Sequence, residues 1–302
     1  MSFLKYFDYL FILRPVLMPP VWTIFLLGYQ RAFFYSNQKN PLGWVFLLVS
    51  LSIGAVYILN QIYDIESDRI NKKLFFLSEG LVSLKSAWLE AILLFSISIA
   101  SAFFISTQLG ILFSVGFIFG FFYSSPPFCF KNRPFLGFLS NSIGHGSLTF
   151  LLGWAINSNV NGKAIIFSLP YLCAVGAVYL NTTLPDIEGD RKMGKMTLGV
   201  KYGIFPVSLI SAILVLVSIV LAFLLRDYPF FIAALLSLPF FVWSTWTKET
   251  KTITLSVKLA VLFLSLIAIY YHPWYFLVLF LGFLGTRIYY KKRFGLVYPT
   301  FI

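Results

Sequence analysis

Long apolar segments recur along the whole chain, and they limit its possible folds more than any other feature. They cover residues 16–35, 42–63, 86–106, 109–124, 138–156, 163–184, 204–225, 229–247, 254–271 and 274–290. Each is close to the roughly 20 residues that a helix needs to cross the apolar core of a bilayer. The mean hydropathy of +0.85 excludes an ordinary soluble domain, and no segment alternates as a membrane β-strand would. The pattern predicts an all-α, polytopic integral membrane bundle, which we expect to form one domain over residues 1–302.

Basic residues are distributed unevenly among the loops between these segments. The loops after the second, fourth, sixth and eighth segments hold Arg69, Lys72, Lys73, Lys85, Lys131, Arg133, Arg191, Lys192, Lys195, Lys201, Lys248 and Lys251. Intervening loops, such as residues 157–162, hold one lysine or none. This alternation follows the positive-inside rule and predicts that the basic loops are cytoplasmic. Because topology explains the net charge of +12, we expect the lipid bilayer as a partner and no nucleic acid.

Acidic residues are rare, and most of them lie in two copies of one sequence, Asp-Ile-Glu-x-Asp-Arg. The copies begin at Asp64 and Asp186 and contain six of the eleven acidic residues in the chain. Four apolar segments separate the copies, so both are expected at the cytoplasmic face. Ionisable groups at a membrane are costly and indicate a functional site by default. The chain is therefore predicted to contain an internal parallel repeat whose two copies form one shared site.

The carboxylates of each copy have the spacing of a metal site. Side chains four residues apart lie on one face of a helix, which places Asp64 with Asp68 and Asp186 with Asp190. Mg²⁺ is typically held by one or two carboxylates together with phosphate oxygens, so two such pairs suit two ions bridged by a diphosphate. Bound metal would act as a Lewis acid and favour departure of an allylic diphosphate. We therefore expect these four carboxylates to be catalytic and to bind Mg²⁺, with Mn²⁺ as a possible substitute.

Other polar residues in the apolar segments give weaker indications. Asn141 and His145 are four residues apart in the fifth segment, next to glycines. One interpretation is close helix packing with a hydrogen-bonded histidine, and the other is a substrate-binding pocket wall near the acceptor. The cysteines Cys129 and Cys173 and the two histidines are too sparse for a metal site of the Cys/His type.

At the level of motifs, the chain resembles the UbiA superfamily of intramembrane prenyltransferases. The first motif of that family is commonly Asn-Asp-x-x-Asp-x-x-x-Asp, and residues 60–68 read Asn-Gln-Ile-Tyr-Asp-Ile-Glu-Ser-Asp. The second motif, Asp-x-x-x-Asp followed by Arg, is matched by residues 186–191. The pair Arg14-Pro15 and the segment Tyr123-Ser124-x-Pro126 also match, and the resemblance covers residues from about 10 to 225.

The resemblance implies a helical bundle that transfers a prenyl group from its diphosphate to an acceptor with the help of Mg²⁺. Nine spans are usual in the family, whereas the sequence has ten apolar segments. Either segment 274–290 is an extra span, or one of the last segments lies in the interface, and on family grounds we favour nine. Gln61 stands where the family usually has an aspartate, and we expect this change to tune metal or acceptor binding without abolishing it.

The resemblance also implies roles for individual residues. The metal and diphosphate ligands would be Asn60, Asp64, Asp68, Asp186 and Asp190. Further candidates for substrate binding are Arg14, Arg69, Lys72, Tyr123, Ser124, Lys131, Arg191 and Lys192. Arg191 could equally support its neighbouring aspartates, and Glu66 and Glu188 are expected to be solvated.

The sequence does not select the acceptor. Quinone-ring acids, haem, chlorophyll precursors and archaeal glycerol phosphate ethers are all used in the family. The expected function is therefore transfer from a prenyl diphosphate donor to a membrane-soluble acceptor, at a site toward the cytoplasmic face. The alternative is a non-enzymatic protein that binds or transports isoprenoid lipids.

Overall fold

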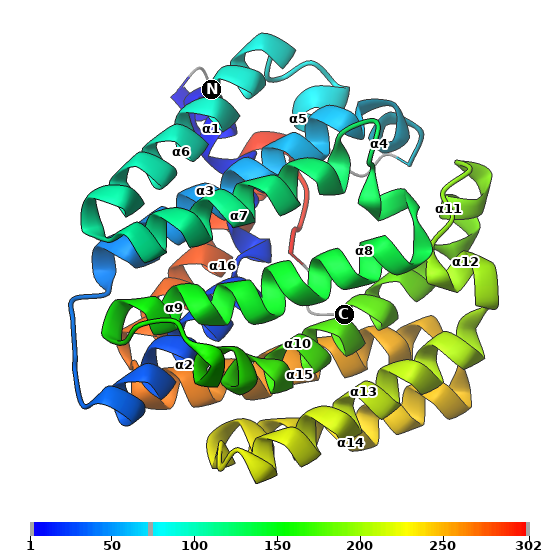
Figure 1. Cartoon of the computed structure of the whole chain (residues 1–302). Helices are drawn as coiled ribbons and strands as arrows, with labels where there is room; N and C mark the ends of the chain where they lie inside the picture. The colour runs from blue at the N-terminus through cyan, green and yellow to red at the C-terminus, as the bar shows by residue number, and fades with distance from the viewer. Residues whose placement is uncertain (1–2, 72–74, 300–302) are drawn as a thin grey trace.

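The structure, a computed structural model, describes residues 3–71 and 75–299, and every regular element within them is helical (Figure 1). The long helices are α2 (Pro19–Ser36), α3 (Gly43–Tyr63), α6 (Leu84–Ile105), α7 (Thr107–Ser124), α10 (Gly162–Thr183), α13 (Ile204–Leu224), α14 (Tyr228–Thr247), α15 (Thr250–Tyr271) and α16 (Trp274–Phe294). The short elements are η1 (Phe3–Phe7), α1 (Asp8–Phe11), η2 (Pro15–Leu17), α4 (Ile65–Asn71), α5 (Phe75–Ser78), η3 (Phe130–Asn132), α8 (Pro134–Asn141), η4 (Ser142–Leu148), α9 (Thr149–Asn157), η5 (Leu184–Asp186), α11 (Ile187–Lys192) and α12 (Leu198–Tyr202). The predicted all-α fold is confirmed.

Fewer helices qualify as candidate membrane spans than the sequence has apolar segments. Among the described residues, seven helices are long and apolar enough to cross a membrane, or eight if the bent pair Phe3–Leu17 and Pro19–Ser36 is one span. The predicted count of nine or ten is not confirmed. Segment 138–156 is divided because the π-helix η4 separates α8 from α9. Helix α16 ends in Lys291, Lys292 and Arg293, which lower its hydropathy.

Helices α2 and α9 approach each other closely along their backbones. A Cβ atom on Gly28 would collide with the carbonyl oxygen of Phe150, and one on Gly153 would collide with that of Phe25. Small residues of this kind let helices approach within a membrane. The contact holds the first long helix against the segment that carries Asn141 and His145 and so fixes one wall of the candidate site.

Helix α1, near the start of the chain, packs against the end of α16. Arg293, at the end of α16, donates to both carboxylate oxygens of the buried Asp8, at 3.0 and 3.1 Å, and Tyr289 also donates to this carboxylate. The Tyr289 ring stacks on Phe11 with a centroid distance of 3.8 Å and also contacts Phe76 of α5. The segment that follows the first acidic motif is thereby packed with α1 and α16.

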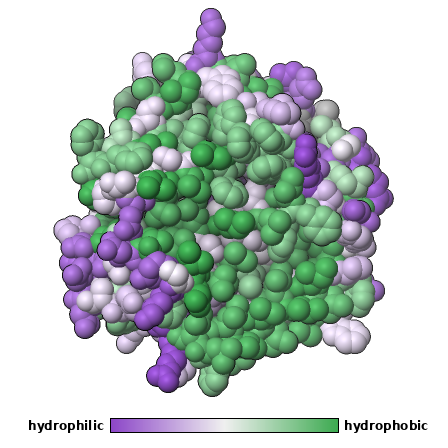
Figure 2. All heavy atoms as spheres, viewed as in Figure 1, coloured by the Kyte–Doolittle hydropathy of each residue, from purple (hydrophilic) through white to green (hydrophobic). Residues whose placement is uncertain are grey.

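The acidic motifs lie at one end of the bundle. Elements α4 and α11, which follow α3 and α10, appear on the same side in Figure 1. Figure 2 shows a broad apolar face between two polar margins, as expected for a protein that crosses a membrane. Elements α4 and α11, which carry the acidic motifs, therefore lie at the edge of the apolar surface, beyond the ends of α3 and α10.

Candidate active site

The first acidic motif continues the direction of α3 after that helix ends. The Asp64 amide donates to the Asn60 carbonyl at 3.0 Å, and the Asp68 amide donates to the Asp64 carbonyl at 2.7 Å. Asp64 is half-buried and Asp68 is buried, with 9 % of its surface exposed. Glu66, between them, is exposed, as predicted. The helical path thus turns the two aspartates inward and leaves the glutamate in solvent.

Lys131, in η3, connects the loop after α7 to this motif. Its ammonium lies 2.8 Å from Oδ2 of Asp64 and donates to Oδ1 of Asn60 at 3.0 Å. The hydroxyl of Ser124 donates to the same Asn60 oxygen at 3.1 Å. Burial lowers the pKa of Lys131 and outweighs the opposing effect of Asp64. The predicted residues Asn60, Asp64, Ser124 and Lys131 therefore form one hydrogen-bonded cluster.

The second motif begins in η5, a 3-10 turn that contains Pro185 and joins α10 to α11. Asp186 is exposed in η5, and Asp190 is half-buried in α11. Helix α11 ends in a Schellman motif: Gly194 has a φ of 68°, its amide donates to the Arg191 carbonyl, and the Lys195 amide donates to the Asp190 carbonyl at 2.9 Å.

This turn directs the side chain of Lys195 toward the first motif. Its ammonium lies 3.5 Å from Oδ1 of Asp64, while its backbone is bonded to Asp190. One residue therefore contacts both copies of the repeat. The prediction that the two copies meet at one place agrees with this contact.

Asp68 shows how strongly the site concentrates charge. Burial first, and the neighbouring Asp64 second, raise its pKa to about 6. The cations Arg14, Lys195 and Lys131 oppose that rise. Three basic residues from distant parts of the sequence thus act on one carboxylate, as expected for a site that binds an anion together with metal ions.

The side-chain oxygens of the site suit a hard divalent cation that is also coordinated by a bound ligand. All the expected metal-binding side chains offer oxygen, which Mg²⁺ prefers. Within 3–71 and 75–299, no group of three or more His, Cys, Asp or Glu side chains is close enough to hold a metal alone. Such an ion would take one or two carboxylates, and phosphate and water oxygens would complete its shell. The residues therefore fit Mg²⁺ in a complex with a diphosphate.

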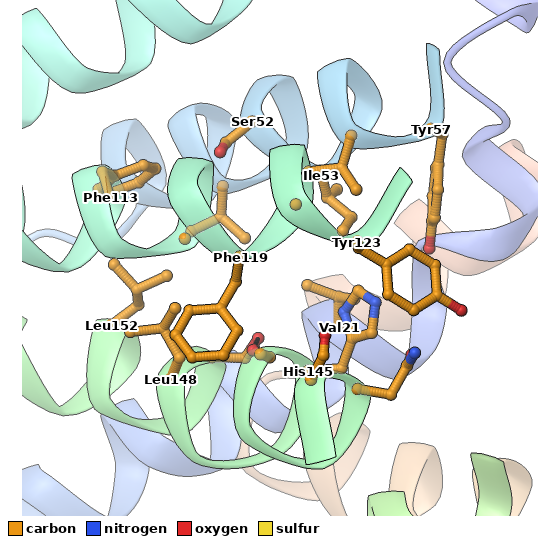
Figure 3. Close-up of a pocket in the computed structure, with 18 of the residues that line it drawn as sticks. Val21, Ser52, Ile53, Tyr57, Phe113, Phe119, Tyr123, His145, Leu148 and Leu152 are labelled. Atoms are coloured by element: carbon orange, nitrogen blue, oxygen red, sulfur yellow. Dashed lines mark hydrogen bonds between the residues drawn. The ribbon is translucent and has the colours of Figure 1, made fainter. Parts of the chain in front are cut away.

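A cavity of about 220 Å³, here called the first cavity, extends from this cluster into the bundle. Its walls come from α2, α3, α7 and the segment from α8 to α9, and Arg14, Asn60 and Tyr123 line its polar end. Figure 3 shows Tyr57 and Tyr123 together at one end and Phe113 at the other. A ligand with a charged head and an apolar tail matches this change in polarity.

Asn141 and His145 both line the first cavity. They flank the start of the π-helix η4, whose wider turn keeps residues four apart on one face. Figure 3 shows His145 projecting into the space between this segment and α7. The pocket-wall interpretation of this pair agrees with the structure. The packing interpretation applies to the neighbouring Gly146, which contacts the backbone of Leu172.

Some expected residues lie elsewhere. Arg69 donates to the Ser78 carbonyl at 3.2 and 3.3 Å and so supports the segment after the first motif. Arg191 and Lys192 are exposed on α11. Lys72 lies outside the described residues. Gln61 points to the other side of α3, where its amide donates to the carbonyls of Ile12 and Tyr57.

Two residues were missed as site residues by sequence reasoning. Lys195 was grouped with the topological charges, although Gly194 before it is a signal for a helix-ending turn. Tyr57 lines the first cavity, donates to the Leu17 carbonyl at 2.9 Å, and lies under the Arg14 guanidinium at 6.0 Å. It lies one turn before Gln61, within an apolar run that offers no signal for a single aromatic residue.

Comparisons with known proteins agree with this geometry. The model of the UbiA prenyltransferase family matches residues 16–254. A 2-acyl-4-prenylphloroglucinol 6-prenyltransferase from Humulus lupulus is 33 % identical over 180 residues, which are 55 % of this chain and 43 % of the relative. A digeranylgeranylglyceryl phosphate synthase from Methanosphaera stadtmanae is 32 % identical over 185 residues, 61 % of this chain and 66 % of the relative. The matches thus span less than two thirds of either relative.

The fold also matches a solved structure. A UbiA homologue from Archaeoglobus fulgidus, bound to DMAPP and Mg²⁺, has a TM-score of 0.60 to this chain. The sequences are 22 % identical, and the match covers 86 % of this chain and 99 % of the homologue. At this identity the likeness concerns the fold.

Proposed function

The chain belongs to the UbiA prenyltransferase family, and on this premise we propose that it transfers a prenyl group from an isoprenyl diphosphate to a membrane-soluble acceptor. The reaction would depend on Mg²⁺, with Mn²⁺ as a possible substitute, and would begin with ionisation of the allylic diphosphate. Residues 1–302 would form a single prenyltransferase domain in the bilayer. The relatives named above carry prenyltransferase or synthase names, and the solved homologue holds DMAPP and Mg²⁺.

One observation carries the proposal. Lys195 contacts Asp64 through its side chain and Asp190 through its backbone, so the two acidic motifs adjoin each other. Asp64 also shares Lys131 with Asn60, which lines the first cavity. Carboxylates that adjoin lysines and an apolar cavity fit a molecule with a diphosphate head and a hydrocarbon tail. A membrane carrier without chemistry would have no need to gather metal-binding oxygens and cations there.

The residues would divide the work as follows. Asp64, Asp68, Asp186 and Asp190, together with Asn60, would hold Mg²⁺, which neutralises the leaving diphosphate when bound. Lys131, Lys195 and Arg14 would bind diphosphate oxygens, because charge-assisted hydrogen bonds to phosphate are strong and directional. Tyr57 and Tyr123 would face the allylic carbon and, with the apolar wall, keep water away from the developing cation.

The basic loops support a cytoplasmic position for this site. Lys131, Lys195 and Lys201 follow apolar segments on the side that the positive-inside rule assigns to the cytoplasm. Prenyl diphosphates are anionic, so a donor arriving from the aqueous side would first meet these cations.

A transfer assay in membranes tests the proposal. Membranes that contain the chain, a radiolabelled prenyl diphosphate and Mg²⁺ should convert a quinone precursor or a glycerol phosphate ether into a labelled lipid. Thorough EDTA treatment should abolish the conversion, and added Mg²⁺ should restore it. Donor binding that survives without any transfer to a panel of acceptors would favour the alternative of an isoprenoid-binding or transport protein.

A further inference from the structure

A second cavity adjoins the first one. It has a volume of about 360 Å³ and lies among α2, α10, α13, α14 and α15. The two cavities share a wall formed by Val21, Tyr57, Asn141 and His145. The polar end of the second cavity is lined by Tyr179 and Thr182 of α10, which lie two turns and one turn before Asp186. Each cavity therefore begins beside one of the two acidic motifs.

The interior of the second cavity is apolar even where serine and threonine residues line it. Ser218 and Ser237 line it, but their hydroxyls donate to the carbonyls of Val215 and Ala233 at 2.7 Å. The Thr23 hydroxyl is bonded to Ser265 and Tyr275. Because these hydroxyls already have partners, the wall offers a ligand mainly carbon. A hydrocarbon chain fits this surface, and a polar ring with several hydroxyls does not.

The donor is better accommodated by the first cavity. Arg14, Asn60 and Tyr123 line the first cavity and do not line the second. If the diphosphate binds to Arg14 and the Asn60 cluster, its prenyl tail continues into the first cavity. The second cavity is then left for another apolar group, with the polar atoms of Asn141 and His145 at the boundary between the two.

The size of the second cavity limits what this group can be. A cavity of about 150 Å³ already holds a benzene-sized ligand, so 360 Å³ is far larger than one aromatic ring requires. An acceptor without a chain would leave much of an apolar cavity unfilled. An acceptor with a long chain would fill this space and make the carbon–carbon contacts that an unfilled cavity lacks.

We propose that the second cavity binds a hydrocarbon chain of the acceptor, so that the acceptor is a lipid with its own apolar chain and not a small aromatic acid. The head of this lipid would lie beside Asn141 and His145, and its chain would extend between α10 and α14. This inference rests on the proposed function, since it assigns the donor to the first cavity.

A binding experiment without catalysis tests the assignment. The probes are a tritiated glycerol phosphate ether with a geranylgeranyl chain, glycerol 1-phosphate as its head alone, and homogentisate as an aromatic acceptor without a chain. We expect the purified protein to bind the ether at least about ten times more tightly than either chainless compound. The variants Ala234→Phe and Ala260→Leu, both in the second cavity, should remove that preference. Two variants are used so that a folding defect in one leaves the test intact.

A variant in the first cavity provides the matched control. A Cβ on Gly144 would have open space around it, and Gly144 lines the first cavity only. Gly144→Leu should weaken binding of a radiolabelled prenyl diphosphate in Mg²⁺ and leave the ether's affinity unchanged, while Ala234→Phe should do the opposite. Equal binding of homogentisate and the ether, or loss of donor binding alone in Ala234→Phe, would overturn the assignment. Ether binding without prenyl transfer would count against the proposed function and leave this inference standing.

Discussion

The ammonium of Lys131 lies 2.8 Å from Oδ2 of Asp64 and 3.0 Å from Oδ1 of Asn60, two side chains that sit one helical turn apart. This contact ties the loop after α7 to the end of α3. The same Asp64 oxygens are the expected metal ligands, so the lysine must yield part of its contact when a cation and a diphosphate bind. Lys131 is then already placed to move from the carboxylate to a phosphate oxygen.

Replacement of this lysine should weaken donor binding. We predict that Lys131→Gln raises the apparent KM for the prenyl diphosphate by at least about tenfold, because charge-assisted hydrogen bonds are worth roughly 1.5–3 kcal/mol. Lys251→Gln, at an exposed position on α15, is the matched control and should leave KM unchanged. Saturation curves with the donor decide the matter. Equal, small effects in both variants would show that Lys131 contributes only to membrane topology.

The carboxylates themselves should affect turnover. Asp64→Asn and Asp190→Asn remove a metal-binding charge with little change in shape, and each should lower kcat by at least about 10²-fold, or roughly 2.7 kcal/mol of transition-state stabilisation. Glu188→Gln, at an exposed position of the second motif, should retain its rate. Single-turnover rates over a Mg²⁺ titration provide the measurement. Near-normal rate and metal affinity in either aspartate variant would mean that this aspartate is no ligand.

Two lysines three residues apart, one at the end of α11 and one just after it, distinguish an effect of position from an effect of charge. Lys195 contacts Asp64, whereas Lys192 is exposed on α11. Lys195→Gln should raise the donor KM about three- to tenfold and Lys192→Gln should change it by less than about twofold, since only an aimed donor can bind a particular phosphate oxygen. Sequence reasoning had favoured Lys192, so the opposite ranking in donor titrations would support that earlier expectation over the structure.

The contact between α1 and α16 should matter for stability. Asp8 is 2 % exposed and accepts two hydrogen bonds from Arg293. Arg293→Gln would leave this carboxylate buried with reduced compensation, at a cost of about 3 kcal/mol. Thermal unfolding in detergent should show a lower Tm for Arg293→Gln but not for the exposed Lys292→Gln. The double variant with Asp8→Asn should lose less than the sum of the two single changes. Additive losses would show that the two side chains act independently.

The sequence predicted the helical class and the acidic motifs because both depend on local patterns. The length of an apolar segment is enough to predict a membrane-spanning helix, and the repeated aspartates can be recognised in the sequence whatever the fold. It did not predict the break at η4, because a π-turn leaves the apolar pattern of residues 138–156 unchanged. Nor did it find Lys195 as a site residue or the second cavity. These depend on how a turn at Gly194 and five helices are arranged in space.

The turn after α11 offers a test of how the second motif reaches the first. Gly194 has a φ of 68°, and a Cβ there would meet no atom within 4 Å, so any effect of a substitution comes from the backbone alone. Alanine in this left-handed conformation costs roughly 1–2 kcal/mol, while asparagine tolerates it better. Gly194→Ala should therefore displace Lys195 and raise the donor KM about three- to tenfold, as Lys195→Gln does, whereas Gly194→Asn should stay within about twofold of the unmodified protein. In the combined variant Gly194→Ala with Lys195→Gln, KM should rise no further than in Lys195→Gln alone. If alanine and asparagine behaved alike in donor titrations, the turn would not be what aims Lys195 at Asp64.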